Sequence, residues 1–394
     1  MKDLIYLDNN ATTKIIDQVW DTMVPYFIHN YANASSLYHS MGREANSAIE
    51  KARSQVSKAL NCQTKEIFFN SGATESINTV LKGVYKNYQS KGKHIITAKT
   101  EHKAVLTTLE NLEKEGALIT YLEVDRAGNI DLSALEQSIT PKTIMLCLMA
   151  ANNETGLVHP LDDIAQICKN KDCLFFCDAT QYIGKLPLDL SKTEIDILCL
   201  SAHKFHGPKG IGALFIRRKT KPIQIHPLIE GGGQEHGFRA GTYNVPNIVG
   251  LGNAIAYFQE NNRDAKEIAH LRDYLETALC ELPEVYVHAK QAPRLPNTAS
   301  ICFRHITASE LMTSCPQLAL SSGSACVSGT RDPSHVLLAM GISKEDALAT
   351  VRFSLSTLTT QEEVNKTIEL IKKAVQKVRE HSPIWQLFQA GLIT

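Results

Sequence analysis

The sequence predicts an α/β protein, with a large domain built on a mostly parallel sheet and a smaller α+β domain. The chain has 394 residues, which is more than one hydrophobic core usually supports. From about residue 43 to 217, helical patterns alternate with short apolar runs, as they do in βαβ units. After Pro283 the expected strands and helices become shorter, which indicates a second domain towards the C-terminus.

The elements of the first part follow from their periodicity. Ile49, Ala52 and Val56 recur at helical spacing and predict a helix over residues 45–60. Short apolar runs rich in β-branched and aromatic residues predict strands between turn signals. The strands are expected at 4–7, 66–69, 94–98, 118–122, 143–149, 173–177, 195–200 and 213–217, and further helices near 103–116 and 161–170.

The second part has fewer but clear signals. A long helix is expected over residues 246–280, with a break at the polar cluster 261–264. Thr360 and Glu363 fit a capping box, and the apolar spacing that follows predicts a C-terminal helix.

Composition excludes several classes of partner. The 41 basic and 41 acidic residues cancel, so no nucleic acid or anionic membrane is expected. No apolar run approaches the roughly 20 residues that span a bilayer, and the N-terminus leads directly into a strand, without a signal peptide. The ten cysteines form no CxxC pair, so we expect a reducing, cytoplasmic location and no metal site.

Lys204 is the first candidate for chemistry. It follows the strand expected at 195–200, in a glycine-rich segment. A lysine held at a strand end can form a Schiff base with pyridoxal phosphate (PLP), which also needs an acid near its ring nitrogen and a phosphate cradle. The alternative is a solvated lysine in a turn. A nicotinamide cofactor is not expected, because Gly210 and Gly212 lead into a strand, not a helix.

Two further segments supply the acid and the cradle. Asp178 ends an apolar strand, at the edge where parallel sheets bind ligands. Residues 70–76 follow another strand and open a helix, where free N–H groups attract anions, and Thr74 adds a hydroxyl. The alternatives are a helix N-cap for Asp178 and a plain capping box at Ser71 or Thr74. Their shared place on strand ends of one sheet favours the cofactor.

Cys326 differs from the other cysteines in its surroundings. It lies in a small, polar, glycine-bearing stretch, which predicts an exposed loop, whereas the others lie mostly in apolar runs. An exposed thiol favours a chemical role, and the alternative is an incidental loop cysteine.

These motifs also carry a family resemblance. The chain resembles the cysteine desulfurases of the NifS/IscS class, which are fold type I PLP enzymes of the class V aminotransferase superfamily. The resemblance spans nearly the whole chain in the same order. It departs at Ala32 and Ala34, where relatives commonly have Gly and Pro. The matching segments are residues 6–13, 71–76, 100–102, 152–156, 178–181, 201–204, 239–242 and 321–326.

The resemblance implies a domain division and roles for single residues. The large PLP-binding domain would span 15–258, and the small domain would combine 1–14 with 259–394 and carry the cysteine loop. Asn153 and Arg352 would bind the substrate carboxylate; a surface arginine is the alternative for Arg352. The catalytic residues would be Cys326, Lys204 and His102. The cofactor would be bound by Lys204, Ala73, Thr74, His102, Asp178, Gln181, Ser201, His203 and, from a neighbouring subunit, Thr242.

The expected reaction converts L-cysteine to L-alanine and leaves the sulfur on Cys326 as a persulfide. The sulfur would then pass to acceptor proteins, such as an iron–sulfur scaffold, or into thiolation, and the enzyme would be a homodimer. One alternative is another fold type I enzyme, such as a selenocysteine lyase or an aminotransferase. The alternative from another class is a non-catalytic PLP-binding interaction protein.

Overall fold

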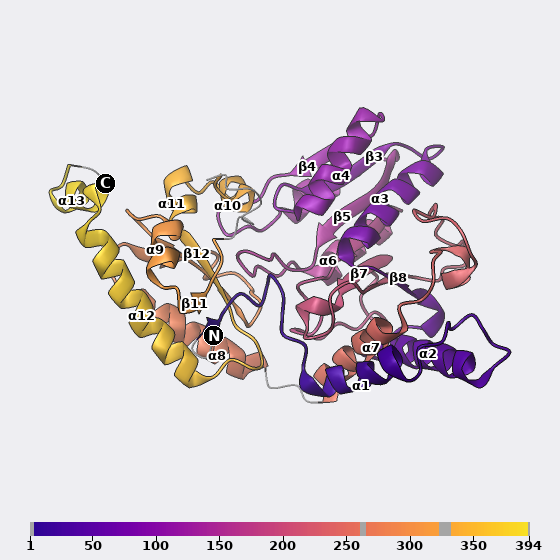
Figure 1. Cartoon of the computed structure of the whole chain (residues 1–394). Helices are drawn as coiled ribbons and strands as arrows, with labels where there is room; N and C mark the ends of the chain where they lie inside the picture. Colours follow the sequence, from indigo (N-terminus) through magenta and orange to yellow (C-terminus); the bar gives the residue numbers. More distant parts are fainter. Residues whose placement is uncertain (1–3, 261–264, 323–331, 393–394) are drawn as a thin grey trace.

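A computed structural model gives the fold and describes residues 4–260, 265–322 and 332–392. Within these residues, helices enclose a seven-stranded sheet, and a smaller group of strands and helices lies beside it (Figure 1). The large sheet has the strand order β2-β8-β7-β6-β5-β3-β4. Its strands are β2 Ile67–Asn70, β3 His94–Ala98, β4 Leu118–Leu122, β5 Thr143–Met149, β6 Leu174–Asp178, β7 Ile197–Ser201 and β8 Gly212–Ile216.

The strand directions place the carboxyl ends of several strands at one edge of the sheet. β4, β3, β5, β6 and β7 pair in parallel, and β8 is antiparallel to both β7 and β2. β2 therefore runs in the same direction as β7. The carboxyl ends of β2, β3, β5, β6 and β7 consequently share one edge, which is where open α/β sheets bind ligands.

Helices cover both faces of this sheet because its strands are apolar on both sides. Ile96 and Phe175 belong to a buried cluster shared with α1, α2, α6 and α7. Their neighbours Ile95 and Phe176 point to the other face and pack with α3 and α4. The helices are α1 Asp17–Ile28, α2 Ser40–Leu60, α3 Ala73–Tyr88, α4 Lys103–Lys114, α5 Leu132–Ser138, α6 Leu161–Asn170 and α7 Val245–Glu260.

The smaller part is built on the antiparallel sheet β12-β10-β9. The N-terminal β1 (Ile5–Tyr6) pairs with β11 (Leu318–Ala319), and Asn9 N–H donates to the Ser354 carbonyl at 3.2 Å. The beginning and the later part of the chain therefore lie side by side. The other elements are β9 Val285–Val287, β10 Thr298–Phe303, β12 Thr350–Ser354, α8 Ala265–Leu279, α9 Ala308–Ser314, α10 His335–Ala339, α11 Lys344–Leu348, α12 Gln361–Glu380 and α13 Pro383–Gln389.

Most expected elements are present. The strands at 94–98, 118–122 and 143–149 and the helix at 161–170 have the expected bounds. The helix expected over 45–60 begins earlier, at Ser40, and the one expected near 103–116 ends at Lys114. α7 and α8 replace the long helix over 246–280, and its expected break at 261–264 lies outside the described residues. The capping box of Thr360 and Glu363 is confirmed at the start of α12.

Three further expectations bear on function. No described helix is long and apolar enough to cross a membrane. Nine cysteines are described, and seven of them are buried, whereas Cys62 and Cys280 are partly exposed. One buried cluster gathers residues between 5 and 7 and between 268 and 375, apart from the clusters around the large sheet. The domain bounds 1–14, 15–258 and 259–394 stay a prediction.

Candidate active site

Lys204 ends a short 3-10 turn directly after β7, at the ligand-binding edge of the sheet. Its Nζ donates to the carbonyl oxygens of Asn10 at 2.7 Å and Ala11 at 2.8 Å. Burial lowers the pKa of Lys204 to about 8, the charge of Arg352 acts in the same direction, and Asp178 opposes it. The residue is thus not a solvated turn lysine. Part of its population is the neutral amine near neutral pH, and the neutral amine is the nucleophilic form.

Asp178 is the last residue of β6, which is parallel to β7 and adjacent to it. It is 6% exposed, and one carboxylate oxygen accepts from Thr180 N–H at 3.0 Å and from the Cys199 thiol at 3.5 Å. No α-helix begins at Asp178, so the alternative of a helix N-cap is wrong. Burial lowers the pKa of both Lys204 and His102, and the negative charge of Asp178 acts to raise it, so the Asp178 carboxylate lies close to both side chains.

The N-terminus of α3 lies near the end of β7. Gly72 precedes the helix with a φ of 145°, and a Cβ on Gly72 would lie 3.4 Å from Ser201 Oγ. Gly72 occupies the N-cap position of α3 and has no side chain to cap the helix. The Glu75 carboxylate instead accepts from Ser71 N–H at 2.9 Å. A plain capping box is therefore not the explanation of this motif. The first turn, with Ala73 and the exposed Thr74, faces Ser201 across the edge.

Besides burial, the charge of Lys204 acts on the pKa of both His203 and His102. His203 Nδ1 is 3.2 Å from Thr12 Oγ1, and burial lowers the pKa of His203 to about 4. His102 caps α4, and its Nδ1 accepts from Ala104 N–H at 3.1 Å. The His102 residue is exposed overall, yet the atoms packed around its ring lower its pKa. The residue therefore still has a surface that a ligand can reach.

Arg352 lies on β12, the edge strand of the small sheet, but it is only 5% exposed. Its guanidinium donates to Asp8 Oδ1 at 2.7 Å and to the Asn153 carbonyl at 3.0 Å. Its Nε is buried and has no hydrogen-bond partner among the residues that the structure describes. A surface arginine is therefore excluded. Arg352 already binds one carboxylate and has a donor to spare, which suits it to a second carboxylate.

Cys326 lies outside the described residues, but its described neighbours on both sides are anchored. Ser321 pairs with Arg352 through their backbones, and Arg352 N–H donates to the Ser321 carbonyl at 2.7 Å. On the other side, the Ser334 hydroxyl donates to Glu154, and His335 Nε2 is 2.9 Å from the Glu101 carbonyl. Both anchors contact segments that carry predicted site residues.

Thr242 is exposed in the segment before α7. It lines a cavity with Ser71 and Arg239, and Arg239 Nε donates to Glu75 at 2.9 Å. This contact places the Thr242 segment beside the start of α3. Whether Thr242 serves a neighbouring subunit stays a prediction.

Asn10 forms hydrogen bonds with several residues of this site, although the sequence analysis gave it no role. Its carbonyl accepts from Lys204 Nζ and from Gln181 Nε2, at 2.7 and 2.8 Å. Its side-chain oxygen is 3.1 Å from Lys185 Nζ, and its side-chain nitrogen donates to the Asn153 carbonyl at 3.1 Å. Lys185 was also missed.

The residues at this edge fit PLP. They supply an amine with a lowered pKa, a buried carboxylate beside it, and a helix N-terminus with hydroxyl donors. The small residue Gly72 keeps Ser201 open to a ligand, because a side chain there would enter the gap and strain a positive φ.

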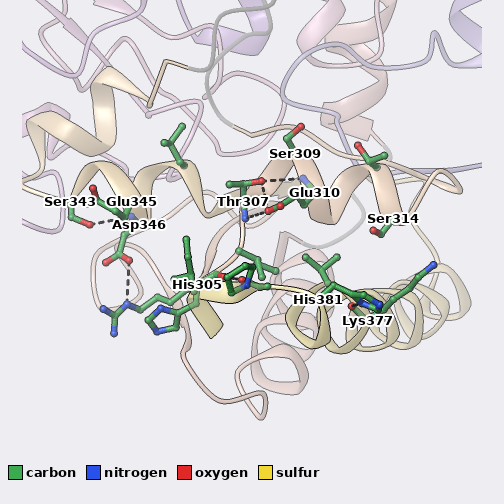
Figure 2. A pocket seen from close by; sticks show the side chains of 18 residues that line it. His305, Thr307, Ser309, Glu310, Ser314, Ser343, Glu345, Asp346, Lys377 and His381 are labelled. Carbon is green, nitrogen blue, oxygen red and sulfur yellow. Dashed lines mark hydrogen bonds and ion pairs between the residues drawn. The ribbon is translucent and has the colours of Figure 1, made fainter. Parts of the chain in front are cut away.

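A large cavity lies away from this edge of the sheet. Its volume is about 940 Å³, and it is lined by residues of α9, α11, α12 and α13 and their connections, including Thr307, Glu310, Lys377 and His381 (Figure 2). None of the predicted site residues in the described ranges lines it. It therefore takes no part in the site at the sheet edge.

Comparisons with known proteins identify the family. The model of the aminotransferase class-V family matches residues 5–367. The chain belongs to the class-V aminotransferase family. Within that family, a cysteine desulfurase IscS of Anaeromyxobacter sp. (strain Fw109-5) is 42% identical over 100% of this chain and 97% of the relative. A cysteine desulfurase IscS of Rickettsia africae (strain ESF-5) is 44% identical over 98% of this chain and 95% of the relative.

Solved structures agree with this assignment. A NifS-like protein has a TM-score of 0.89 and 40% identity, over 95% of this chain and 100% of its own. A structure described as SspA in complex with cysteine has a TM-score of 0.80 and 36% identity, over 89% of this chain and 98% of its own. The protein is thus a cysteine desulfurase with the fold of type I PLP enzymes, and PLP is its cofactor.

Proposed function

We propose that this desulfurase acts through Lys204, His102 and Cys326, and that Cys326 carries sulfur from L-cysteine as a persulfide. The observation that carries the proposal is the position of Lys204. Its amine lies at a strand end with a pKa of about 8, close to the carboxylate of Asp178. PLP, when bound, supplies an electrophilic carbonyl carbon and an electron-accepting ring.

Arg352 and Asn153 bind and orient the substrate carboxylate in this proposal. The Arg352 guanidinium is fixed by Asp8 and by the Asn153 carbonyl, so it loses little freedom when a carboxylate arrives. Its unpartnered Nε offers a donor that is already desolvated. We assign the phosphate of PLP to Ala73, Thr74, Ser201, His203 and the partner subunit's Thr242, and its ring to His102, Asp178 and Gln181.

Two groups move protons. Lys204 Nζ, once neutral, takes the proton from the substrate Cα, as its lowered pKa allows, and returns a proton to Cα after the C–S bond has broken. His102 Nδ1 already accepts from Ala104 N–H, so Nε2 is the nitrogen that exchanges a proton with the substrate sulfur.

Cys326 performs the sulfur step. Its thiolate attacks the sulfur of the substrate, an S–S bond forms, and the substrate C–S bond breaks. The electron pair of the broken bond remains on the substrate carbon, which takes up a proton and becomes the methyl group of alanine. The products are L-alanine and a Cys326 persulfide, and the step needs no external oxidant or reductant.

The two described thiols that are partly exposed, Cys62 and Cys280, support the choice of Cys326. Burial raises the pKa of Cys62 to about 12, and it also raises the pKa of Cys280. Both are therefore poor nucleophiles at neutral pH. The remaining described cysteines are buried.

We further propose a cytoplasmic homodimer that passes sulfur to acceptor proteins, such as an iron–sulfur scaffold, or into thiolation. The names of the IscS relatives support desulfurase chemistry, and the absence of a spanning helix among the described residues is consistent with this location.

The test is alanine and sulfide release from L-cysteine, with the visible absorbance of bound PLP recorded on the same samples. We expect Cys326→Ala to keep the absorbance and lose alanine formation by more than about 100-fold, because no thiol then takes the sulfur. Lys204→Ala should lose both normal absorbance and turnover.

Cys62→Ala is the matched control and should keep wild-type turnover, since the Cys62 thiol has a raised pKa. Wild-type rates from Cys326→Ala would show that another group accepts the sulfur. Normal turnover by Lys204→Ala would remove the proposed role of that lysine.

A further inference from the structure

We propose that Lys185 is a positioning residue that holds the amide of Gln181 with its N–H group towards the cofactor ring. The inference rests on the proposed function in one respect: Lys204 is taken as the residue that holds PLP. Neither the family motifs nor the comparisons assign a role to Lys185.

The hydrogen bonds of Lys185 fix the orientation of two amides. Its Nζ donates to Gln181 Oε1 and to Asn10 Oδ1, the second at 3.1 Å. Each of these two amides turns its oxygen towards Lys185, because an amide oxygen accepts the hydrogen bond that the lysine amine donates. The amide nitrogens of Gln181 and Asn10 then point away from Lys185.

The amide nitrogen of Gln181 points towards the region around Lys204 Nζ. Gln181 Nε2 and Lys204 Nζ donate to the same atom, the Asn10 carbonyl oxygen, at 2.8 and 2.7 Å. The ring oxygen of PLP is attached next to the carbon that bonds a lysine. Gln181 Nε2 is therefore the donor that this oxygen meets when Lys204 holds the ring. A flipped amide would instead present its oxygen and repel the ring oxygen.

Packing alone does not account for a lysine at this position. Lys185 forms no ion pair with an acidic residue within the described ranges, although it lies near the positive groups of Lys204 and Arg352. Lys185 and Lys204 line one small cavity of about 30 Å³. Burial lowers the pKa of Lys185 well below its usual range, and these two cations add to the effect. An apolar side chain would fill the space without this cost.

The experiment is a pH titration of the visible absorbance of the PLP-loaded protein. Lys185→Met keeps an unbranched side chain that is one atom shorter, and it removes the amine that makes both hydrogen bonds. We expect its titration midpoint to rise by about one pH unit, because a donor on the ring oxygen stabilises the deprotonated form of the cofactor. Lys192→Met, an exposed lysine on the same segment, should keep the wild-type midpoint.

A double-mutant cycle separates orientation from charge. In a Gln181→Leu background, Lys185→Met should no longer move the midpoint, since no amide remains to be oriented. A shift of equal size in both backgrounds would show that Lys185 acts through its charge and would overturn the proposal, as would an unchanged midpoint in Lys185→Met.

A second variant covers the case in which Lys185→Met does not fold. Lys185→Gln can donate to only one of the two amides through a shorter side chain, so a smaller rise of the midpoint is expected, and no rise would overturn the proposal. Failure of the proposed function is distinguishable, because it would appear as a wild type that titrates but forms no alanine.

Discussion

At the scale of single residues, His159 is a group that the reaction does not use. It lies between β5 and α6 and is 3% exposed, and neither ring nitrogen has a hydrogen-bond partner in the described structure. Burial lowers the pKa of His159 to about 4. The folded protein therefore keeps this ring neutral at pH values where the unfolded chain, with a histidine pKa near 6.5, takes up a proton.

This difference predicts how stability depends on pH. The contribution of His159 is fully favourable above pH 6.5 and is lost as the pH falls towards 4, by about 3 kcal/mol in total. His159→Leu lacks the titrating ring, so its melting temperature should fall less between pH 7 and 4.5 than that of the wild type. Differential scanning fluorimetry of both proteins measures this, and parallel curves would contradict it.

Some site residues can be predicted from local sequence patterns, and others cannot. Lys204 and Asp178 follow apolar strands directly, so local patterns predict their place at the sheet edge. Asn10 and Lys185 were missed because their roles come from contacts between distant segments; Asn10 Nδ2, for example, donates to Thr298 Oγ1 at 2.8 Å. Periodicity describes neighbours along the chain and carries no information on such pairs.

At the scale of elements, the backbones of β7, β8 and the start of α3 pack closely against one another at the site. A Cβ on Gly212, the first residue of β8, would lie 2.5 Å from the Leu200 carbonyl oxygen and 2.7 Å from Gly72 Cα. Both are backbone atoms, which cannot move aside as a flexible side chain does. Gly212 therefore sets how near the N-terminus of α3 comes to Ser201.

We predict that Gly212→Ala lowers the free energy of unfolding by about 1–3 kcal/mol, as overpacking does. It should also release PLP faster, because it displaces the start of α3. Thermal melts and the loss of absorbance on dialysis measure the two effects. Gly233→Ala is the matched control, since a Cβ there meets no atom within 4 Å. Equal behaviour of the two variants would contradict the prediction.

The elements themselves were predictable where they are long or strongly patterned. β3, β4 and β5 stand out as apolar runs, and the capping box of Thr360 locates the start of α12. The strand expected at 4–7 is present as β1, whereas β11, which has two residues, was not expected and pairs with β1 across the chain. Their pairing, like the register of the small sheet, depends on tertiary contacts that override local preference.

At the scale of the whole molecule, α1 and its connection to α2 carry many exposed apolar side chains, and Tyr38 is fully exposed. Exposed apolar side chains that gather in one segment point to an interaction surface. The large exposed apolar residues of this segment are Trp20, Phe27, Ile28, Tyr31, Leu37 and Tyr38.

If this segment forms the homodimer contact, Tyr38→Asp should weaken self-association by at least about tenfold, because it places a charge in an apolar contact. Light scattering after size-exclusion chromatography would then show a shift from twice 43.6 kDa towards the mass of one chain. Tyr274→Asp, an exposed tyrosine on α8, serves as the control. A dimer that is unchanged by Tyr38→Asp would place the contact on another face.

The contact between Asn10 and Ser354 limits the order in which the enzyme can fold during its synthesis. Ribosomes release a protein from its N-terminus, yet the Asn10 amide donates to the Ser354 hydroxyl, 344 positions later. Asn10 also holds the carbonyl that Lys204 and Gln181 share. The large sheet can form on the ribosome, but its ligand-binding edge stays unfinished until almost the whole chain has emerged. We therefore expect PLP to bind stably only after Ser354 has emerged and paired with Asn10.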